Sequence, residues 1–468
     1  MTEMAASKAR SLIWRILLAA ILCLSIPVTG NILDPASYAP EDVIVTDVAI
    51  IGGGAAGTYA AINLQQMGQK VVVVEERKHL GGHTNTHTDR STNITIDYGV
   101  QAYLNNSVTL DFFAHFDVPL IDYGDPSIAF RPADFKTGQP SDFKPSRDLS
   151  RWAAHLAKYP WLDSSWKIPL PVDPDLLLPL KDFLAKYNMT DITFSLYYSA
   201  QGLSNPVYQP TVNVMKMISP SFLREQRGGA VVTARHSNKE IYRKAEVKLG
   251  SSLFTKSKVT AVTRPQNGPV SLAVKTRTGS KLIKASKLLI TMPPTLHNLE
   301  PFDLNMEELG IFTQWKHFGY YTILFNNTSL PPNVQWINVD SSTAYHIPEL
   351  PAPSMISSTR IPGTVFVYFR SPFDLKRAEI QNAAIKAIRN IQRAQNLTQT
   401  TPNVLKFKSH APFQLNVPAD CIASGFYSDL VALQGKRNTW YSGAAFVGHN
   451  SGLIWEYTRN LLPQIVSH

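Results

Sequence analysis

The apolar positions beyond residue 40 first form a near-continuous β-branched run over residues 43–51, interrupted at Thr46-Asp47. Such a run is typical of a strand covered on both faces of a parallel sheet. A glycine-rich hexapeptide follows at once, and a helical apolar pattern then continues to Gly68. Residues 70–74 are again apolar and predict a second buried strand. The order of these elements predicts one β-α-β unit, preceded by an N-terminal arm.

The rest of the chain alternates between helical and strand-like stretches. Residues 110–227 combine many prolines with aromatic and helical patches, whereas strand-like alternation returns over 253–264 and 270–290. Residues 413–468 predict a strand, a turn of small residues and a final helix. Between them, a strand at 364–369 precedes an amphipathic helix, whose apolar face carries Ile380, Ala384, Ala387, Ile388 and Ile391.

The turn after the first strand has the spacing Gly-x-Gly-x-x-Gly, formed by Gly52, Gly54 and Gly57 around Ala56. Glycine is needed there because side chains would keep a dinucleotide pyrophosphate away from the backbone N–H groups and the helix N-terminus. Glu75 ends the second strand, where a carboxylate accepts hydrogen bonds from ribose hydroxyls. We therefore predict a dinucleotide site that includes all five residues.

A second glycine pair, Gly81 and Gly82, lies shortly after Glu75 and precedes His83. This arrangement resembles the FAD-binding signature of the flavin amine oxidase and phytoene desaturase superfamily. The resemblance implies FAD as the cofactor, with both glycines, His83 and Val259 among its contacts. Those proteins often carry arginine at the position of His83, so this chain departs from the pattern in the charge it offers to phosphate at neutral pH.

The C-terminal segment fits the same interpretation. A stretch of small residues around Gly443 is followed by Gly448-His449-Asn450-Ser451-Gly452 and a predicted helix over 453–462. Either Asn450 or Ser451 can cap that helix. The positive end of its dipole suits flavin oxygens that gain negative charge on reduction. We therefore place Gly443, Asn450 and Ser451 among the cofactor contacts.

Several phrases of the sequence resemble one narrower group, the fungal β-cyclopiazonate dehydrogenase family of secondary-metabolite flavoproteins. They lie at residues 81–84, 97–101, 409–413, 425–427, 433–435 and 443–451. The resemblance implies FAD-dependent oxidation of a hydrophobic secondary metabolite, such as a terpenoid or prenylated natural product, by dehydrogenation or oxidative cyclisation. The intervening insertions, where substrate choice would lie, match no family.

Taken with this resemblance, the pattern predicts an α/β fold: a Rossmann-type FAD-binding domain, with a parallel sheet and helices, plus an inserted α+β substrate domain. The FAD-binding segments are predicted at 43–109, 231–300 and 406–468. The two parts of the substrate domain are predicted at 110–230 and 301–405.

The candidate catalytic residues are Gln101, His410 and His449, and Tyr103 is a further candidate on the substrate side. Flavin accepts a hydride, so the protein mainly orients the substrate and excludes water. The sequence contains no second Gly-x-Gly-x-x-Gly for a nicotinamide cofactor. Reoxidation by O₂, or redox-neutral chemistry, is therefore favoured. The scattered histidines form no metal-ligand pattern.

Two alternatives to oxidation remain open. The first is a redox-neutral flavin isomerase that moves double bonds in a lipid-like substrate. The second is a flavin-binding protein without turnover. Two roles are also open for Cys421: it is either an inert buried thiol or the site at which FAD is covalently attached.

The N-terminus predicts entry into the secretory pathway. Residues 1–30 combine a basic start, an apolar stretch at 16–26 and small residues near residue 30, as a cleaved signal peptide does. The stretch is too short for a membrane span, so no stable span is expected. Asparagines in Asn-x-Ser/Thr sequons are predicted glycosylation sites: Asn93, Asn105, Asn188, Asn326, Asn327 and Asn396.

The net charge of +10 says little about the class of binding partner. The basic residues are spread along the chain, without an arginine-rich arm or basic-aromatic alternation. Nucleic acid binding is therefore not expected. The predicted partners are a hydrophobic small-molecule substrate and O₂.

Overall fold

The computed structural model describes residues 32–124 and 128–467, so the predicted signal peptide at 1–30 lies outside the described residues. One sheet has the strand order β10-β11-β12-β1-β2-β9, with β19 paired to β12. The strands β9, β2, β1, β12 and β19 run parallel, whereas β11 is antiparallel to both of its neighbours, β12 and β10. Their bounds are Val43–Ile51 (β1), Val71–Glu75 (β2), Leu253–Thr255 (β9), Lys258–Thr263 (β10), Val270–Thr276 (β11), Gly279–Ile290 (β12) and Thr439–Tyr441 (β19).

Both faces of this sheet are covered, which explains the continuous apolar run of β1. Val48 and Ile50 pack into one core, whereas Ala49 and Ile51 pack into another on the opposite face. The core of Val48 and Ile50 includes residues from four helices. They are Ala55–Gln66 (α2), Ser107–His115 (α3), Lys239–Leu249 (α10) and Ser451–Ser467 (α15).

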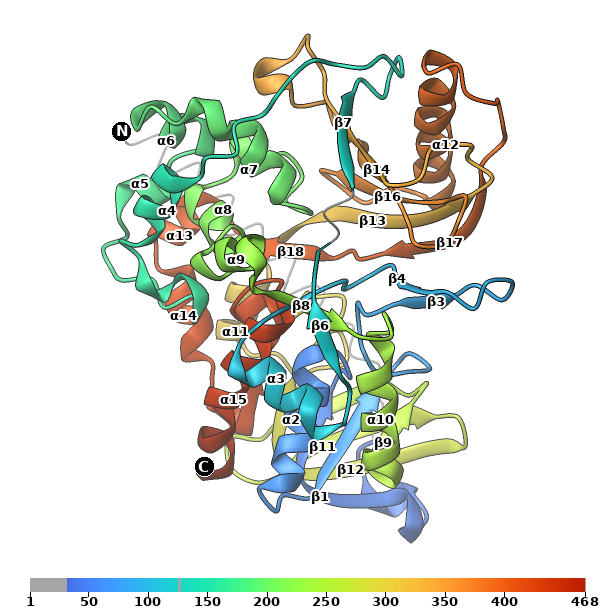
Figure 1. Cartoon of the computed structure of the whole chain (residues 1–468). Helices are drawn as coiled ribbons and strands as arrows, with labels where there is room; N and C mark the ends of the chain where they lie inside the picture. The colour runs from blue at the N-terminus through green and yellow to red at the C-terminus, as the bar shows by residue number, and fades with distance from the viewer. Residues whose placement is uncertain (1–31, 125–127, 468) are drawn as a thin grey trace.

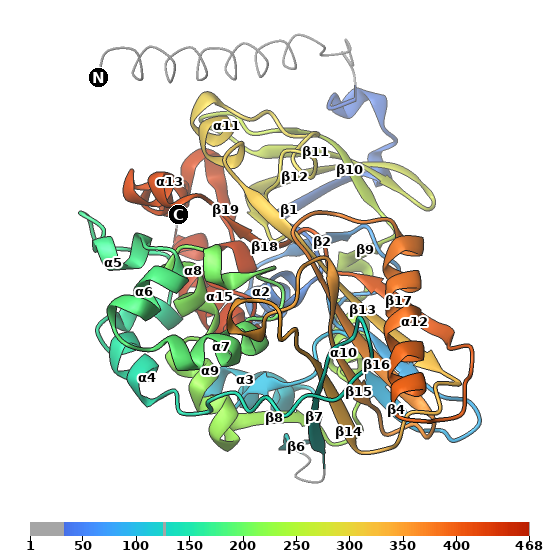
Figure 2. The ribbon, with the colours of Figure 1, turned by 90° about the horizontal axis from the view of Figure 1, so that it is seen from above.

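The second sheet has the order β17-β13-β16-β15-β14-β7, with β18 paired to β13, and lies at the upper right of Figure 1. Arg377–Ala394 (α12) covers one of its faces through the predicted apolar residues, all of which are buried. Figure 2 shows α12 along the outer side of the sheet. The strands are Ala129–Ala133 (β7), Lys316–Asn326 (β13), Val334–Asn338 (β14), Ala352–Ser358 (β15), Thr364–Ser371 (β16), Asn403–Ser409 (β17) and Phe413–Asn416 (β18).

Short helices fill the left of Figure 1, where the sequence is rich in proline. They are Ser150–Leu156 (α4), Pro174–Leu177 (α5), Leu180–Lys186 (α6), Thr193–Ser199 (α7), Thr211–Met217 (α8) and Pro220–Arg224 (α9). Pro179 separates α5 from α6, because proline disfavours a helical conformation at the residue before it.

The remaining elements connect the two sheets. The helices are Met306–Phe312 (α11), Ala419–Ala423 (α13) and Phe426–Ala432 (α14). The strands are Thr86–Thr88 (β3), Thr95–Asp97 (β4), Tyr103–Leu104 (β5), Leu120–Asp122 (β6) and Ala230–Thr233 (β8). The predicted fold class is confirmed: a Rossmann-type domain carries an inserted domain of mixed helices and strands.

Candidate functional site

The glycine turn joins the end of β1 to α2, and its three glycines have different physical roles. A Cβ on Gly57 would lie 1.9 Å from the carbonyl oxygen of Gly52, so Gly57 is required by the packing of the turn itself. A Cβ on Gly54 would meet only the Cα of Gly82, at 3.8 Å. The protein therefore leaves space beside Gly54, as a cradle for a phosphate requires.

Thr291, the first residue after β12, braces this turn. Its Oγ1 lies 3.0 Å from the carbonyl oxygen of Ile51 and 2.8 Å from that of Gly52, in position to donate to either. A Cβ on Gly443 would lie 3.2 Å from the carbonyl oxygen of Thr291. Thr291 was not predicted as a site residue. Its position at the carboxyl end of a parallel strand was the available signal.

Glu75 fixes the first glycine turn, and a backbone hydrogen bond joins that turn to the second. Its carboxylate accepts hydrogen bonds from the N–H groups of Gly53 (2.6 Å) and Arg77 (2.7 Å). The N–H of Gly81 in turn donates to the carbonyl oxygen of Gly53 at 2.8 Å. Glu75 therefore stabilises the turn whose backbone would approach a pyrophosphate. Its contact with ribose stays a prediction.

Arg77 and Lys408 bring positive charge to the second glycine turn. Arg77 donates through Nη1 to the carbonyl oxygen of Gly82 at 2.7 Å. Burial, together with the charge of Arg77, lowers the pKa of Lys408, a half-buried residue of β17. Burial and the same two cations lower the pKa of His83 to about 4. His83 is therefore neutral at pH 7, and the positive charge comes from its neighbours, which the sequence analysis did not single out.

Replacing Lys408 with methionine is expected to weaken FAD binding about tenfold to hundredfold, the effect of losing one charge-assisted contact. The apolar stem is largely preserved, so the loss reports the charge. Lys406→Met is the matched control, because Lys406 lies two residues earlier in β17 and influences His87 instead. Titration of the flavin-free protein with FAD measures both affinities. Equal affinities for the two variants would contradict this role.

Three predicted residues, His83, His410 and His449, meet although they come from distant parts of the chain. The His83 ring lies 4.9 Å from that of His410 and 6.4 Å from that of His449, measured between centroids. Phe413 packs against His449 at 4.0 Å. We call these four side chains the histidine cluster. Burial lowers the pKa of His449 to about 3 and that of His410 well below its usual value, so both are neutral.

Hydrogen bonds assign the tautomers of two of these histidines. The Thr322 hydroxyl donates to the carbonyl oxygen of Tyr98 at 2.8 Å, so it accepts from Nε2–H of His410 at 3.1 Å. His410 therefore presents an unprotonated Nδ1. In His449 the assignment is reversed, because Nε2 accepts from the N–H of Gln414 at 3.1 Å, which leaves the proton on Nδ1.

These depressed pKa values predict a pH dependence of stability. A histidine with a depressed folded pKa stabilises the fold above its unfolded pKa of about 6.5, and this contribution disappears as the pH falls through the folded pKa. Between pH 6.5 and 4 the unfolded chain binds protons that the folded one excludes. For the flavin-free protein, each such histidine therefore lowers the free energy of unfolding by about 1.4 kcal/mol per pH unit.

His449→Asn should flatten this slope by about 1.4 kcal/mol per pH unit between pH 4 and 6. Burial raises the pKa of Asp97 to about 7 and that of Glu225 to about 6, which opposes the histidines. The comparison of variants removes this common background. Denaturant titrations at several pH values measure it, with the exposed His297→Asn as control. Parallel curves for wild type and His449→Asn would contradict the assignment.

Asn450, not Ser451, caps α15. Its Oδ1 accepts from the N–H of Leu453 at 3.2 Å, and its Nδ2 donates to Glu225 at 2.8 Å. Ser451 is the first residue of the helix. The capped N-terminus therefore follows His449 directly, so the positive end of the α15 dipole lies next to the histidine cluster. Contacts of Gly443, Asn450 and Ser451 with FAD stay predictions.

Gln101 and Tyr103 have different surroundings. Gln101 accepts a hydrogen bond through Oε1 from the hydroxyl of Tyr368 at 2.8 Å, which ties the first domain to β16. Nδ2 of Asn238 holds the loop by donating to the carbonyl oxygen of Val100 at 2.9 Å. Tyr103, in contrast, is only 1% exposed and stacks on Trp455. The expectation that Tyr103 faces the substrate is therefore corrected: it belongs to the core beneath the site.

The other predicted positions are spread over the molecule. Val259 is buried in β10, close to the residues that follow β2, because the N–H of Ser257 donates to the carbonyl oxygen of Glu75. Ala56 is buried in α2, and Cys421 is half-buried in α13 against the helical core. Asn326 is half-buried in β13. The other sequon asparagines are exposed: Asn93, Asn105, Asn188, Asn327 and Asn396.

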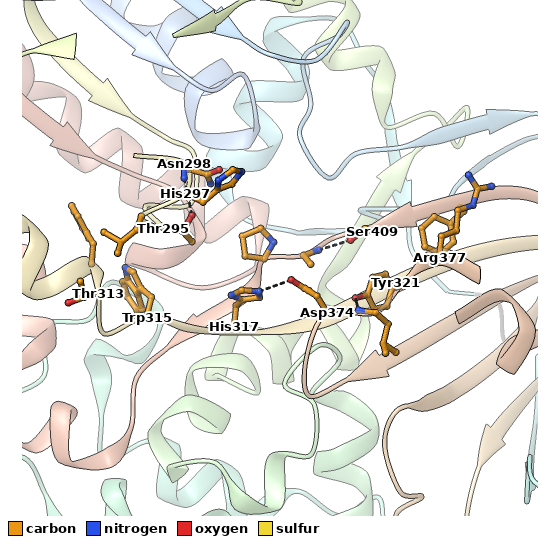
Figure 3. Close-up of a pocket in the computed structure, with 16 residues that line it drawn as sticks. Thr295, His297, Asn298, Thr313, Trp315, His317, Tyr321, Asp374, Arg377 and Ser409 are labelled. Carbon is orange, nitrogen blue, oxygen red and sulfur yellow. Dashed lines mark hydrogen bonds and ion pairs between the residues drawn. The ribbon is translucent and has the colours of Figure 1, made fainter. Parts of the chain in front are cut away.

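A cavity of about 740 Å³ opens on the other side of the second sheet (Figure 3). Tyr321 and Phe407, which line it, belong to the face that packs on α12. Figure 3 shows His317 and Asp374 pointing toward each other, 3.1 Å apart, across its middle. None of the predicted cofactor or catalytic residues lines this cavity, so we do not assign it to the flavin.

Two further properties bear on the kind of site. Within residues 32–124 and 128–467, no three His, Cys, Asp or Glu side chains are grouped so that they could hold a metal ion. No helix in the same ranges combines the length and apolar character that crossing a bilayer needs.

Comparison with known proteins identifies the class. Residues 50–116 match the model of the NAD(P)-binding Rossmann-like domain. The chain is 36% identical over 437 residues to the FAD-dependent oxidoreductase pigF of Monascus ruber, covering 92% of this chain and 94% of the relative. It is 31% identical over 437 residues to the β-cyclopiazonate dehydrogenase of Aspergillus oryzae, covering 91% and 94% of the two chains.

Solved structures agree on the fold. A fatty acid isomerase from P. acnes that produces CLA superimposes with a TM-score of 0.74 at 17% identity, over 90% of this chain and 98% of the other. Wild-type putrescine oxidase bound to putrescine gives a TM-score of 0.66 at 14% identity, over 91% and 100%.

The fold and the paired glycine turns therefore define a flavin-dependent enzyme. The chain belongs to the family of FAD-dependent oxidoreductases that includes β-cyclopiazonate dehydrogenase, so the predicted family and cofactor are confirmed. The residues of this chain fit FAD: the space beside Gly54 faces Gly82, and the cations Arg77 and Lys408 flank the second turn.

Proposed function

We propose that the protein oxidises a hydrophobic secondary metabolite, by dehydrogenation or oxidative cyclisation, and that O₂ accepts the electrons. The observation that carries the proposal is the histidine cluster, which joins the second glycine turn, the β17–β18 loop and the start of α15. Its three imidazole rings are neutral. Phe413 within the cluster and Tyr320 beside it add aromatic surface. Such a lining favours an apolar substrate and excludes water.

Bound FAD supplies a two-electron acceptor for a hydride from a substrate C–H bond. The chain itself orients the substrate. Gln101, fixed by its bond to Tyr368, donates one amide N–H to the carbonyl oxygen of Asp97 at 3.5 Å, and its second N–H can bind a substrate oxygen. His410 offers Nδ1 to the proton that the substrate loses, while Nε2–H stays bonded to Thr322. The balance is substrate-H₂ plus O₂ giving oxidised substrate plus hydrogen peroxide.

The test is anaerobic mixing of the holoenzyme with candidate substrates, chosen by comparing metabolites of the source organism with and without the encoding gene. Oxidation predicts loss of the flavin absorbance, its return in air, and one peroxide per product. A redox-neutral isomerase would convert the substrate without net bleaching or O₂ consumption. Bleaching that is not restored by air would exclude O₂ as acceptor. A protein without turnover would bind FAD and show neither change.

We further propose that the enzyme enters the secretory pathway and carries N-linked glycans. The exposure of Asn93, Asn105, Asn188, Asn327 and Asn396 supports this, since a glycan needs an accessible amide. A mass decrease after endoglycosidase treatment of the secreted protein would support the proposal, and an unmodified intracellular protein with an intact N-terminus would refute it.

A further inference from the structure

Arg370, in β16, is a fully buried cation that lacks an anionic partner among the described residues. Its side chain is 0% exposed. Across the described residues 32–124 and 128–467, its Nη groups reach only two backbone carbonyl oxygens, those of Tyr198 at 3.2 Å and Ser204 at 3.5 Å, and its Nε has no hydrogen-bond partner. The guanidinium carbon lies 4.2 Å from the ring centroid of Tyr197.

Arg264 shows how this fold otherwise treats a buried arginine. It is also 0% exposed, but its guanidinium binds Asp303 at 2.9 Å and Glu308 at 2.6 Å. A buried charge without such compensation destabilises the fold. Burial lowers the pKa of Arg370, but arginine is not deprotonated in proteins, so it does not escape this cost by losing its proton.

The tyrosines around Arg370 do not supply the missing anion. Burial raises the pKa of Tyr198 to about 12 and also raises the pKa of Tyr320 and of Tyr368. All three phenols are therefore neutral at physiological pH. The ring of Tyr197 lies over the guanidinium, and the three phenols contribute no negative charge to it.

Arg370 lies on the sheet face that meets the histidine cluster. It is paired across the strands with Tyr320 of β13, so the two side chains project from the same face. The Tyr320 ring lies 5.6 Å from that of His410 and 4.9 Å from that of Phe413. Tyr368, two residues before Arg370 on the same face, binds Gln101. One tyrosine ring thus separates the unpaired cation from the proposed site of oxidation.

We propose that Arg370 binds an anionic oxygen group of the substrate, so that the enzyme acts on acidic hydrophobic molecules. A carboxylate or an ionised enol of a 1,3-dicarbonyl compound offers the required chemistry. The aromatic rings of Tyr198, Tyr320 and Tyr368 then contact the apolar remainder. This inference rests on the proposed function, because it names the substrate class of that same site.

Binding of small probes to the oxidised holoenzyme tests the proposal without turnover. Cinnamate is compared with neutral cinnamamide, and dimedone with its methyl enol ether, by following flavin absorbance and thermal melting. We expect the affinity of at least one anion to be about tenfold or more above that of its neutral counterpart. The preferred anion then shows whether the site recognises a carboxylate or an enolate. Equal or weaker binding of both anions would overturn the proposal.

Arg370→Met should abolish this preference, Arg370→Lys should retain part of it, and the exposed Arg360→Met should leave it unchanged. The melting temperature of ligand-free Arg370→Met should stay the same or rise, because an uncompensated buried charge is removed. A lower melting temperature with an intact anion preference would assign Arg370 to the fold and overturn the proposal. If the methionine variant does not fold, the anion preference of the Arg370→Lys variant is compared with that of the wild type, and an equal preference in both would overturn the proposal.

The two proposals fail in different ways. If the oxidase function is wrong, no substrate bleaches the flavin, although the anion preference and its dependence on Arg370 persist. If the assignment of Arg370 is wrong, a bleaching substrate reduces wild type and Arg370→Met equally, and no anion preference is seen.

Discussion

Gly54→Val is expected to yield a folded protein that no longer retains FAD. Among the described residues, the atom nearest to a Cβ at Gly54 is the Cα of Gly82 at 3.8 Å, so the loss of fold stability should be small. The added methyl groups instead occupy the space in which a phosphate would approach the backbone. The flavin-to-protein absorbance ratio, measured before and after incubation with excess FAD, reports the loss, and circular dichroism reports the fold.

Gly57→Ala is the informative comparison for that experiment. Its Cβ would lie 1.9 Å from the carbonyl oxygen of Gly52, so it should destabilise the fold itself and lose flavin as a consequence. The two substitutions thus separate a ligand clash from a packing clash. Stoichiometric flavin in Gly54→Val would contradict the placement of the pyrophosphate, and equal destabilisation by both would contradict the distinction between the glycines.

Glu308→Ala is expected to destabilise the protein by about 3–5 kcal/mol, as removal of one partner from a buried ion pair does. The carboxylate of Glu308 binds Arg264 at 2.6 Å and Arg437 at 3.2 Å, and it accepts from the Tyr441 hydroxyl at 2.8 Å. Its loss leaves Arg264 fully buried, with Asp303 as its one remaining charged partner among the residues that the structure describes. Denaturant unfolding measures the change in the free energy of unfolding.

Glu307→Ala is the matched control, because Glu307 is the neighbouring residue of α11 and forms an exposed pair with Lys436. Exposed pairs contribute about 0.2–1 kcal/mol, so the two losses should differ severalfold. Burial acts to raise the pKa of Glu308, but the hydrogen bonds and charge of Arg264 outweigh it and lower this pKa. The Glu308 contribution should therefore be present above the unfolded pKa of a glutamate and disappear as the pH falls through the folded value. Similar losses for both variants at pH 7 would contradict the network.

The local sequence pattern was sufficient to predict several elements in both domains. The run 43–51 forms β1 with the expected bounds, and the apolar face of α12 is buried as predicted. These features can be predicted locally, because the periodicity of apolar residues along a short segment indicates whether it forms a buried strand or an amphipathic helix. The glycine spacing likewise determined the turn, since its backbone geometry depends on residues within a few positions of one another.

Other parts of the site depended on contacts between distant residues. The sequence singled out His83, His410 and His449 separately, but nothing in it indicated that the three rings lie together, because they come from segments far apart in the chain. Tyr103 was misplaced for the same reason. Its neighbourhood is decided by Trp455, which follows it by more than 300 positions.

By itself, the sequence predicted a dinucleotide site at the Gly52-Gly54-Gly57 turn and, through its resemblance, determined that the cofactor is FAD. The tertiary structure decided which charges and protons surround that site. Burial and neighbouring cations make His83 neutral, Lys408 reaches the second turn from another sheet, and Arg370 lies buried without an anion among the described residues. Desolvation and pairing depend on what the whole chain places around a group, so no local pattern specifies them.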